Sequence, residues 1–271
     1  MSSISDQDYL LSSQYKTAAN LKARIRLHEL YSANKYGWFR WVFDRLDLPA
    51  QASLLEVGCG PGTLWVENLA RVPEGWDVTL TDLSPGMVEE ARANLQGTDR
   101  SFTFHQADAM SIPYPDESFD GVLAMYMLYH VPDRSRALAE MRRVLTPGGK
   151  LYAATLGGMH MYELYELLNR FDAEAAARLP FGPPSPHRLG FVLETGGAEI
   201  ARHFSQVELL RYEDALDVTE AEPLVDYILS SSGSVFDQEQ TLALADFVRA
   251  ELEAKGTIHI RKDNGLFVAR K

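Results

Sequence analysis

Residues 53–62 read Ser-Leu-Leu-Glu-Val-Gly-Cys-Gly-Pro-Gly, an apolar run that carries an acid and enters a glycine-rich turn. The run predicts a β-strand that ends near Glu56. The glycines at Gly58, Gly60 and Gly62 remove the Cβ atoms that would keep a ligand away from the backbone. The stretch therefore predicts a ligand-binding turn between a strand and a helix of a doubly wound α/β sheet.

The segments after the turn indicate what kind of ligand it holds. A helix expected from near Leu64 points its N-terminus at the turn, and a second apolar run, residues 76–81, ends in Asp82. A carboxylate at that position can accept both hydroxyls of a ribose. The pattern predicts a nucleoside site, and an ordinary strand-to-helix turn remains the alternative for the glycine motif taken alone.

The acid before the turn distinguishes between two nucleoside ligands. A dinucleotide site uses the spacing Gly-x-Gly-x-x-Gly, because its pyrophosphate rests on the helix N-terminus. This turn instead has Gly-x-Gly-x-Gly after Glu56. Glu56 would repel a pyrophosphate but suits the ammonium of an amino acid. A ligand with an amino-acid end and a ribose end is S-adenosylmethionine.

Three further segments follow in order. Residues 102–110 predict a third strand that ends in an acid, and residues 112–133 contain a fourth strand. Residues 137–145 predict a helix that Thr-Pro-Gly-Gly stops before a strand at 150–155. With these motifs, residues 50–156 closely resemble the class I S-adenosylmethionine-dependent methyltransferases, and within them the type 11, quinone-biosynthesis-like group of small-molecule enzymes.

The resemblance implies an α/β fold with a doubly wound seven-stranded sheet whose last strand is antiparallel. We expect a single methyltransferase domain over residues 1–271. Its expected parts are an N-terminal helical lid (1–48), a cofactor-binding core (50–156), and a substrate-side helical insertion with the C-terminal strands (157–271). The lid helices should break near residues 32–37.

The C-terminal part contains further predicted elements. Helices are expected at 159–171, 189–195, 222–230 and 238–255, and a strand at 207–212. The chain should close with a hairpin, in which the turn Asp263-Asn264-Gly265 joins strands at 257–262 and 266–270.

The cofactor contacts that the resemblance implies fall at the ends of the first four strands. Those at the methionine end and the ribose are Glu56, the backbone of Gly58, Cys59 and Gly60, and Asp82. Those around the adenine are Leu83 and Met87 on one face, Asp108 at the exocyclic amine, and the backbone of Ala109 or Met110.

Methyl transfer is a direct displacement, so the protein must hold a nucleophile in line with the sulfonium methyl group and exclude water. The resemblance places Met125 and Tyr126, just past the fourth strand, at that methyl group, Met125 as a cofactor contact and Tyr126 as a candidate catalytic residue. His130 titrates near neutral pH and is a candidate general base, with a packed structural role as the alternative. We expect no metal site, since the acids after the strands serve the cofactor.

Polar and aromatic residues outside the core are candidates for the acceptor pocket. They are Tyr15, Tyr31 and Trp38 in the first segment, and His160 and Tyr162 in the helix after the core. Packing in the hydrophobic core is the alternative for the first three, and a helix packing stripe is the alternative for the last two.

Composition restricts the partners. The formal net charge of −12 argues against DNA or RNA, which require a positive surface. No apolar run approaches the length that crosses a bilayer, and the N-terminus shows no targeting pattern. The single cysteine, Cys59, gives no disulfide framework and indicates a reducing compartment. We expect a cytoplasmic protein with a small-molecule substrate, whose oligomeric state the sequence does not indicate.

These features predict S-adenosylmethionine-dependent methyl transfer to oxygen, nitrogen or carbon of a small organic acceptor, with S-adenosylhomocysteine as the product. A catalytically silent S-adenosylmethionine-binding partner subunit is one alternative. A nicotinamide-dependent oxidoreductase is another, but it would share only the turn and Asp82 and would not need Glu56 or the Asp108-Ala109 pair.

Overall fold

Seven strands form one mixed sheet in the computed structural model, which describes residues 18–178, 190–232 and 236–271. The strands are β1 (Gln51–Val57), β2 (Gly75–Asp82), β3 (Ser101–Gln106), β4 (Phe119–Met125), β5 (Leu145–Leu156), β6 (Ser205–Val218) and β7 (Ile258–Arg270). Their order is β3-β2-β1-β4-β5-β7-β6, and β7 runs antiparallel to both of its neighbours. The predicted sheet with an antiparallel last strand is therefore confirmed.

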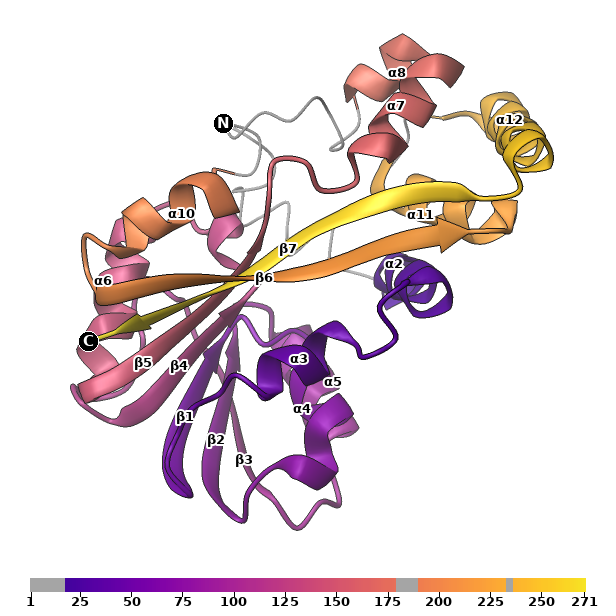
Figure 1. Ribbon diagram of the computed structural model, residues 1–271. Helices are drawn as coiled ribbons and strands as arrows, with labels where there is room; N and C mark the ends of the chain where they lie inside the picture. Colours follow the sequence, from indigo (N-terminus) through magenta and orange to yellow (C-terminus); the bar gives the residue numbers. More distant parts are fainter. Residues whose placement is uncertain (1–17, 179–189, 233–235) are drawn as a thin grey trace.

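Helices cover both faces of the sheet, because the central strands are apolar on both sides. One face carries α3 (Trp38–Phe43), α4 (Thr63–Asn68) and α5 (Pro85–Asn94), and the other carries α6 (Arg134–Val144) and α10 (Leu193–Ile200) (Figure 1). Successive residues of β1 point to opposite faces: Leu54 packs in a first hydrophobic cluster, under α3, α4 and α5, and Leu55 packs in a second one, under α6 and α10. Because β1 to β5 are parallel, their carboxyl ends lie at one shared edge of the sheet, between the two helical layers.

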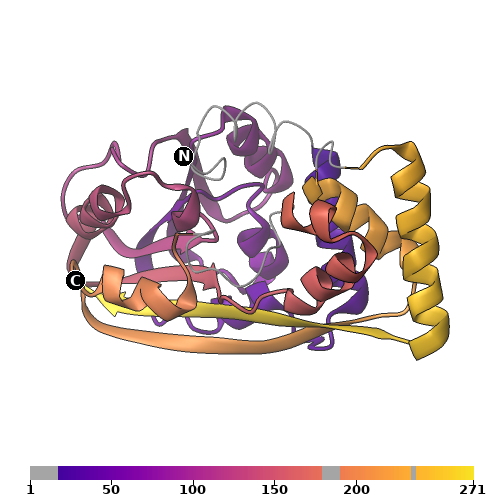
Figure 2. The same ribbon diagram turned by 90° about the horizontal axis from the view of Figure 1, so that it is seen from above.

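The two last strands of the sheet order extend beyond the others. β7 pairs with β5 as far as Asn264, opposite Leu156, whereas its pairing with β6 continues to Ile258. This overhanging ribbon forms a third hydrophobic cluster with five helices (Figures 1 and 2). They are α2 (Ala18–Tyr31), α7 (Tyr162–Phe171), α8 (Ala173–Arg178), α11 (Ala221–Ser232) and α12 (Gln238–Lys255).

The predicted C-terminal hairpin is wrong. β7 passes through residues 263–265 without turning, and Gly265 pairs with Thr155 on one side and Arg211 on the other. A Cβ on Gly265 would lie 2.8 Å from Cδ2 of Leu193, so this glycine serves close packing. Tertiary pairing on both edges thus overrides the turn signal of Asn264-Gly265.

Most other predicted elements lie close to the observed ones. α7, α11 and α12 agree with the predictions, and the N-terminal helices α2 and α3 are separated at residues 32–37 as expected. The predicted helix at 189–195 is wrong in its bounds, because α10 runs from Leu193 to Ile200 and contains Gly196-Gly197. A Cβ on Gly196 would lie 2.9 Å from Phe191, so packing again explains the glycine. None of the helices in the described ranges is long and apolar enough to cross a membrane.

Candidate active site

The glycine turn after β1 has the open geometry that a bound ligand requires. Gly58 and Gly60 have φ values of 69° and 53°, which residues with a Cβ rarely adopt. A Cβ on Gly60 would meet no atom within 4 Å, whereas one on Gly58 would lie 2.8 Å from Met127. The Cys59 amide donates to Thr81 O at 2.9 Å. The turn is therefore fixed to β2 and exposes the Gly60 backbone.

Asp82 holds the turn from the end of β2. Its Oδ2 accepts from the Gly60 amide at 2.9 Å, and its Oδ1 accepts from the Ser84 amide at 2.8 Å. Burial raises the pKa of the Asp82 carboxyl. Each carboxylate oxygen can accept a further hydrogen bond, so the side chain can still bind two hydroxyls of a ligand.

Glu56 lies beneath the turn and is 2% exposed. Its Oε2 accepts from Trp65 Nε1 at 2.6 Å. Burial raises the pKa of Glu56 to about 8, and the negative charge of Asp82 adds to this. A cation bound at the turn would favour the ionised form of Glu56, because opposite charges stabilise each other at low dielectric.

The acid after β3 forms a tight turn. Asp108 Oδ1 accepts from the Met110 amide at 2.8 Å, and the Asp108 carbonyl accepts from the Ser111 amide at 2.9 Å. The Met110 amide is thus bonded within the turn. Ala109 is 6% exposed and packs in the cluster beneath it. The other carboxylate oxygen of Asp108 can accept a hydrogen bond from the base of a nucleoside.

The remaining predicted adenine contacts lie at the start of α5. Ser84 caps this helix by accepting from the Met87 amide at 3.4 Å, and Met87 is 6% exposed. The Leu83 carbonyl accepts from Gln106 Nε2 at 2.9 Å. The second bond joins the ends of β2 and β3, so Leu83 and Asp108 lie just past the ends of neighbouring strands.

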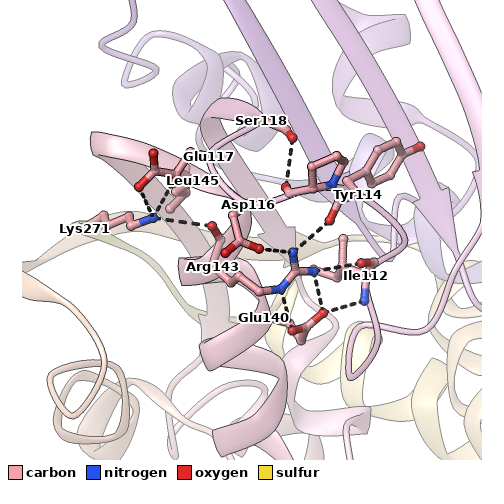
Figure 3. A network of polar contacts seen from close by, with 10 residues as sticks. Ile112, Tyr114, Asp116, Glu117, Ser118, Glu140, Arg143, Leu145 and Lys271 are labelled. Atoms are coloured by element: carbon pink, nitrogen blue, oxygen red, sulfur yellow. Dashed lines mark hydrogen bonds and ion pairs between the residues drawn. The ribbon is translucent and has the colours of Figure 1, made fainter.

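An arginine of α6 fixes the loop that follows Asp108 (Figure 3). The Arg143 guanidinium donates to Glu140, to Asp116 and to the carbonyls of Ile112 and Tyr114, at 2.8–2.9 Å. Glu140 Oε2 also accepts from the Ile112 amide at 2.9 Å. Because one planar fork serves all four groups, Arg143 determines the course of residues 112–116.

Tyr126 directly follows β4 in a strained conformation. Its φ is 55°, an outlier for an aromatic residue, and its amide donates to Ala154 O at 3.1 Å. The ring lies 5.4 Å from that of Trp38, and burial raises the pKa of the Tyr126 phenol. Met125, the last residue of β4, is 7% exposed in the adjoining cluster. Trp38, the first residue of α3, thus meets the end of β4.

The other predicted site residues separate into groups. Tyr31 is 9% exposed in the third cluster, away from the Tyr126 group. His130 ends a 3₁₀ turn, and its ring lies 4.4 Å from that of Tyr129. His160 Nδ1 accepts from the Asp263 amide at 3.1 Å, and Tyr162 begins α7. Tyr15 lies outside the described residues.

The sequence reasoning missed polar residues on the overhanging ribbon. The inward face of β6 and β7 is otherwise apolar over residues 210–218 and 258–268, but it carries the polar side chains of Tyr212, Asp214, Lys262 and Asn264. In the sequence, these residues are two pairs of polar residues spaced two apart, at 212 and 214 and at 262 and 264, which places each pair on one face of a strand. The expected hairpin turn at 263–265 obscured it.

The seven-stranded sheet with its antiparallel β7 has the class I methyltransferase fold. Residues 55–153 match a family model described as a methyltransferase domain. This part of the chain is therefore similar to a methyltransferase domain, and the fold of the whole is the one seen in solved methyltransferase structures.

Two curated relatives match this core. Methyltransferase GfsG of Streptomyces halstedii is 40% identical over 119 residues, covering 42% of this chain and 41% of that protein. Ubiquinone/menaquinone biosynthesis C-methyltransferase UbiE of Hahella chejuensis is 37% identical over 116 residues, covering 42% and 47%. The chain therefore spans less than half the length of these relatives.

A solved structure resembles more of the chain. Phosphoethanolamine N-methyltransferase 2 of Haemonchus contortus, in complex with S-adenosyl-L-methionine, has a TM-score of 0.59 at 20% identity. The match covers 98% of this chain and 59% of that one. At this identity the likeness concerns the fold.

The raised pKa of Glu56 predicts a pH-dependent effect of Glu56→Gln. Between the ordinary value of 4.5 and about 8, the folded protein binds more protons at this site than the unfolded chain, so the site's contribution to stability falls as pH rises. Glutamine keeps an acceptor for Trp65 and does not titrate. The variant should match the wild type near pH 5 and exceed its unfolding free energy by roughly 2–5 kcal/mol at pH 8. Urea denaturation across this range measures the difference; a difference independent of pH would contradict the assignment.

The network in Figure 3 predicts that Arg143→Lys loosens the loop after Asp108. Lysine cannot reproduce the fork, so the unfolding free energy should fall by about 1–3 kcal/mol. Amide hydrogen exchange at residues 112–118 should become faster. Arg142→Lys is the matched control, because Arg142 is an exposed neighbour on the same helix. Equal exchange in both variants would show that Arg143 does not fix the loop.

Proposed function

We propose that this protein transfers a methyl group from S-adenosylmethionine to oxygen, nitrogen or carbon of a small organic molecule. The observation that carries the proposal is the Gly58–Gly60 turn held by Asp82 at the carboxyl edge of a methyltransferase domain. The name of the relative UbiE, a ubiquinone/menaquinone biosynthesis C-methyltransferase, supports a small-molecule acceptor. The formal charge of −12 supports an acceptor other than a nucleic acid.

The residues at the turn fit this cofactor. Gly60 borders open space, Asp82 has acceptor capacity for ribose hydroxyls, and Glu56 lies where it would oppose an ammonium group. Asp108 and Met87 are the groups that we assign to the adenine end. The thiol of Cys59 is 7% exposed and its pKa is raised by burial, so we give it a packing role in the turn. A lone buried thiol also supports a cytoplasmic location.

Bound S-adenosylmethionine supplies an electrophilic methyl group on sulfur. The chain's own part is to orient the acceptor and exclude water. Tyr126 is held rigidly at the end of β4, and Trp38 covers it from the lid, so these two rings keep water from the transfer point. For a hydroxyl acceptor, His130 would take the proton from the acceptor oxygen.

Loss of the Asp82 carboxylate tests cofactor binding. Asp82→Ala should weaken the affinity for S-adenosylhomocysteine by about 1–3 kcal/mol, the scale of hydrogen bonds to a charged acceptor. Isothermal titration calorimetry measures the affinity, with the melting temperature followed alongside because the Gly60 amide also loses its partner. Asp77→Ala, an exposed acid of the same strand, should leave the affinity unchanged. Wild-type affinity in Asp82→Ala would remove Asp82 from the site.

The assignment of His130 has a separate test. If the acceptor is a hydroxyl, His130→Ala should lower the turnover number by about 10²–10⁴ and leave the affinity for S-adenosylhomocysteine nearly intact. Single-turnover methyl transfer and calorimetry give the two quantities. A loss below tenfold, or a parallel loss of cofactor affinity and melting temperature, would assign His130 to the structure alone.

A further inference from the structure

Four polar residues form a band across the inward face of the overhanging ribbon. β6 and β7 pair Tyr212 with Asn264 and Asp214 with Lys262, and residues two apart lie on the same face. On that face, Leu266 belongs to the hydrophobic cluster under α3 and α4. Further along, Leu216 and Ile260 belong to the cluster under α2 and α11. The polar band, defined as these four residues, therefore separates two apolar cores.

Unmet hydrogen bonds gather around the polar band. Asn264 is 4% exposed, and its Oδ1 lacks a partner among the described residues. The same holds for Trp38 Nε1 and His28 Nδ1. Tyr212 is 3% exposed, and its hydroxyl makes no hydrogen bond of good geometry, although the Gly37 amide lies near it. Native proteins leave few such atoms, so their concentration here indicates a ligand that satisfies them.

The polar band adjoins the point of methyl transfer. The Trp38 ring lies 5.4 Å from that of Tyr126 and 5.4 Å from that of Tyr212. The negative charge of Asp214 contributes to the raised pKa of the Tyr126 phenol, after the larger effect of burial. An acceptor that packs against Trp38 and Tyr126 would thus place its polar groups on the band.

The polar band is electrically neutral. Lys262 Nζ lies 2.5 Å from Asp214 Oδ2 and donates to Ser32 Oγ at 3.0 Å. The side chains of this ion pair are 7% and 1% exposed. Burial lowers the pKa of His28 and of His160 to about 3, so both rings are uncharged at neutral pH. The charges of the band are paired with each other, and a charged acceptor would therefore be buried without a counter-ion.

We propose that Tyr212, Asn264, His28 and Trp38 Nε1 bind the methyl acceptor, and that the acceptor is an uncharged hydroxylated ring. This inference rests on the proposed function. A ring suits the aromatic group that Trp38 forms with Trp41, Tyr126 and Tyr212, and a hydroxyl both donates and accepts. It can therefore satisfy the Trp38 indole donor as well as the Asn264 acceptor. Uncharged groups avoid the desolvation cost that an ion would carry into this site.

Three probes with one shared ring test the charge preference. They are 4-methylcatechol, which is uncharged, 3,4-dihydroxybenzoate, which is an anion, and dopamine, which is a cation. Calorimetry on the full chain saturated with S-adenosylhomocysteine should give at least tenfold tighter binding of 4-methylcatechol than of either ion. Equal or tighter binding of an ion, or binding of none of the three, would overturn the proposal. Failure of the wild type to bind S-adenosylhomocysteine would instead contradict the proposed function on which it rests.

Single hydroxyl deletions test the residues. Tyr212→Phe should weaken 4-methylcatechol binding at least fivefold, keep the affinity for S-adenosylhomocysteine within twofold, and leave the melting temperature unchanged or higher. Tyr152→Phe is the matched control, because Tyr152 is also a buried tyrosine and its hydroxyl bonds instead to the Asp47 carbonyl, in the segment before β1. It should leave 4-methylcatechol binding unchanged. Two outcomes would overturn the role of Tyr212: a Tyr212→Phe variant that binds the probe like the wild type, or one that melts at a lower temperature before the probe is added. Either would mean that the hydroxyl bonds to a buried water of the folded protein and not to the acceptor.

Discussion

The hydrogen bond from the Gly60 amide to Asp82 is the constraint on which the site depends. It joins the turn after β1 to the end of β2, and the Cys59 amide adds a second link through Thr81. The bond needs a positive φ at Gly60, which glycine adopts without strain. Because parallel strands end at one edge of the sheet, this fixed corner also sets where Tyr126 and Asp108 lie relative to the turn.

The unequal lengths of the strands give the molecule its second core. Past Asn264 and Leu156, β7 keeps only β6 as a partner, and a two-stranded ribbon in water is marginally stable. The ribbon gains its stability from helices that arise at three separate places in the sequence, α2, α7 with α8, and α11 with α12. The polar band lies where this cluster meets the main sheet, and side chains from distant segments converge there.

Burial sets the protonation of the acids beside the glycine turn and of the histidines beside the polar band. It raises the pKa of Glu56 and Asp82 beside the turn, and it lowers the pKa of His28 and His160 beside the polar band. All four shifts disfavour charge, as loss of hydration does for acids and bases alike. The site is therefore poor in free charge before a ligand binds, and a cation at the turn would have the most to gain from Glu56.

The sequence by itself determined the strands of the core, the glycine turn, and the positions of Asp82 and Asp108 at strand ends. These follow from local patterns: apolar runs, glycine spacing and helix signals report on neighbours in the chain. Only the tertiary structure decided that β7 continues through Asp263-Asn264-Gly265, because ladder pairing with β5 and β6 outweighs a turn propensity. It also decided that Tyr31 is a core residue while Trp38 meets Tyr126. The polar band needed the first of these decisions, since its four residues become neighbours only when β6 and β7 pair in this register.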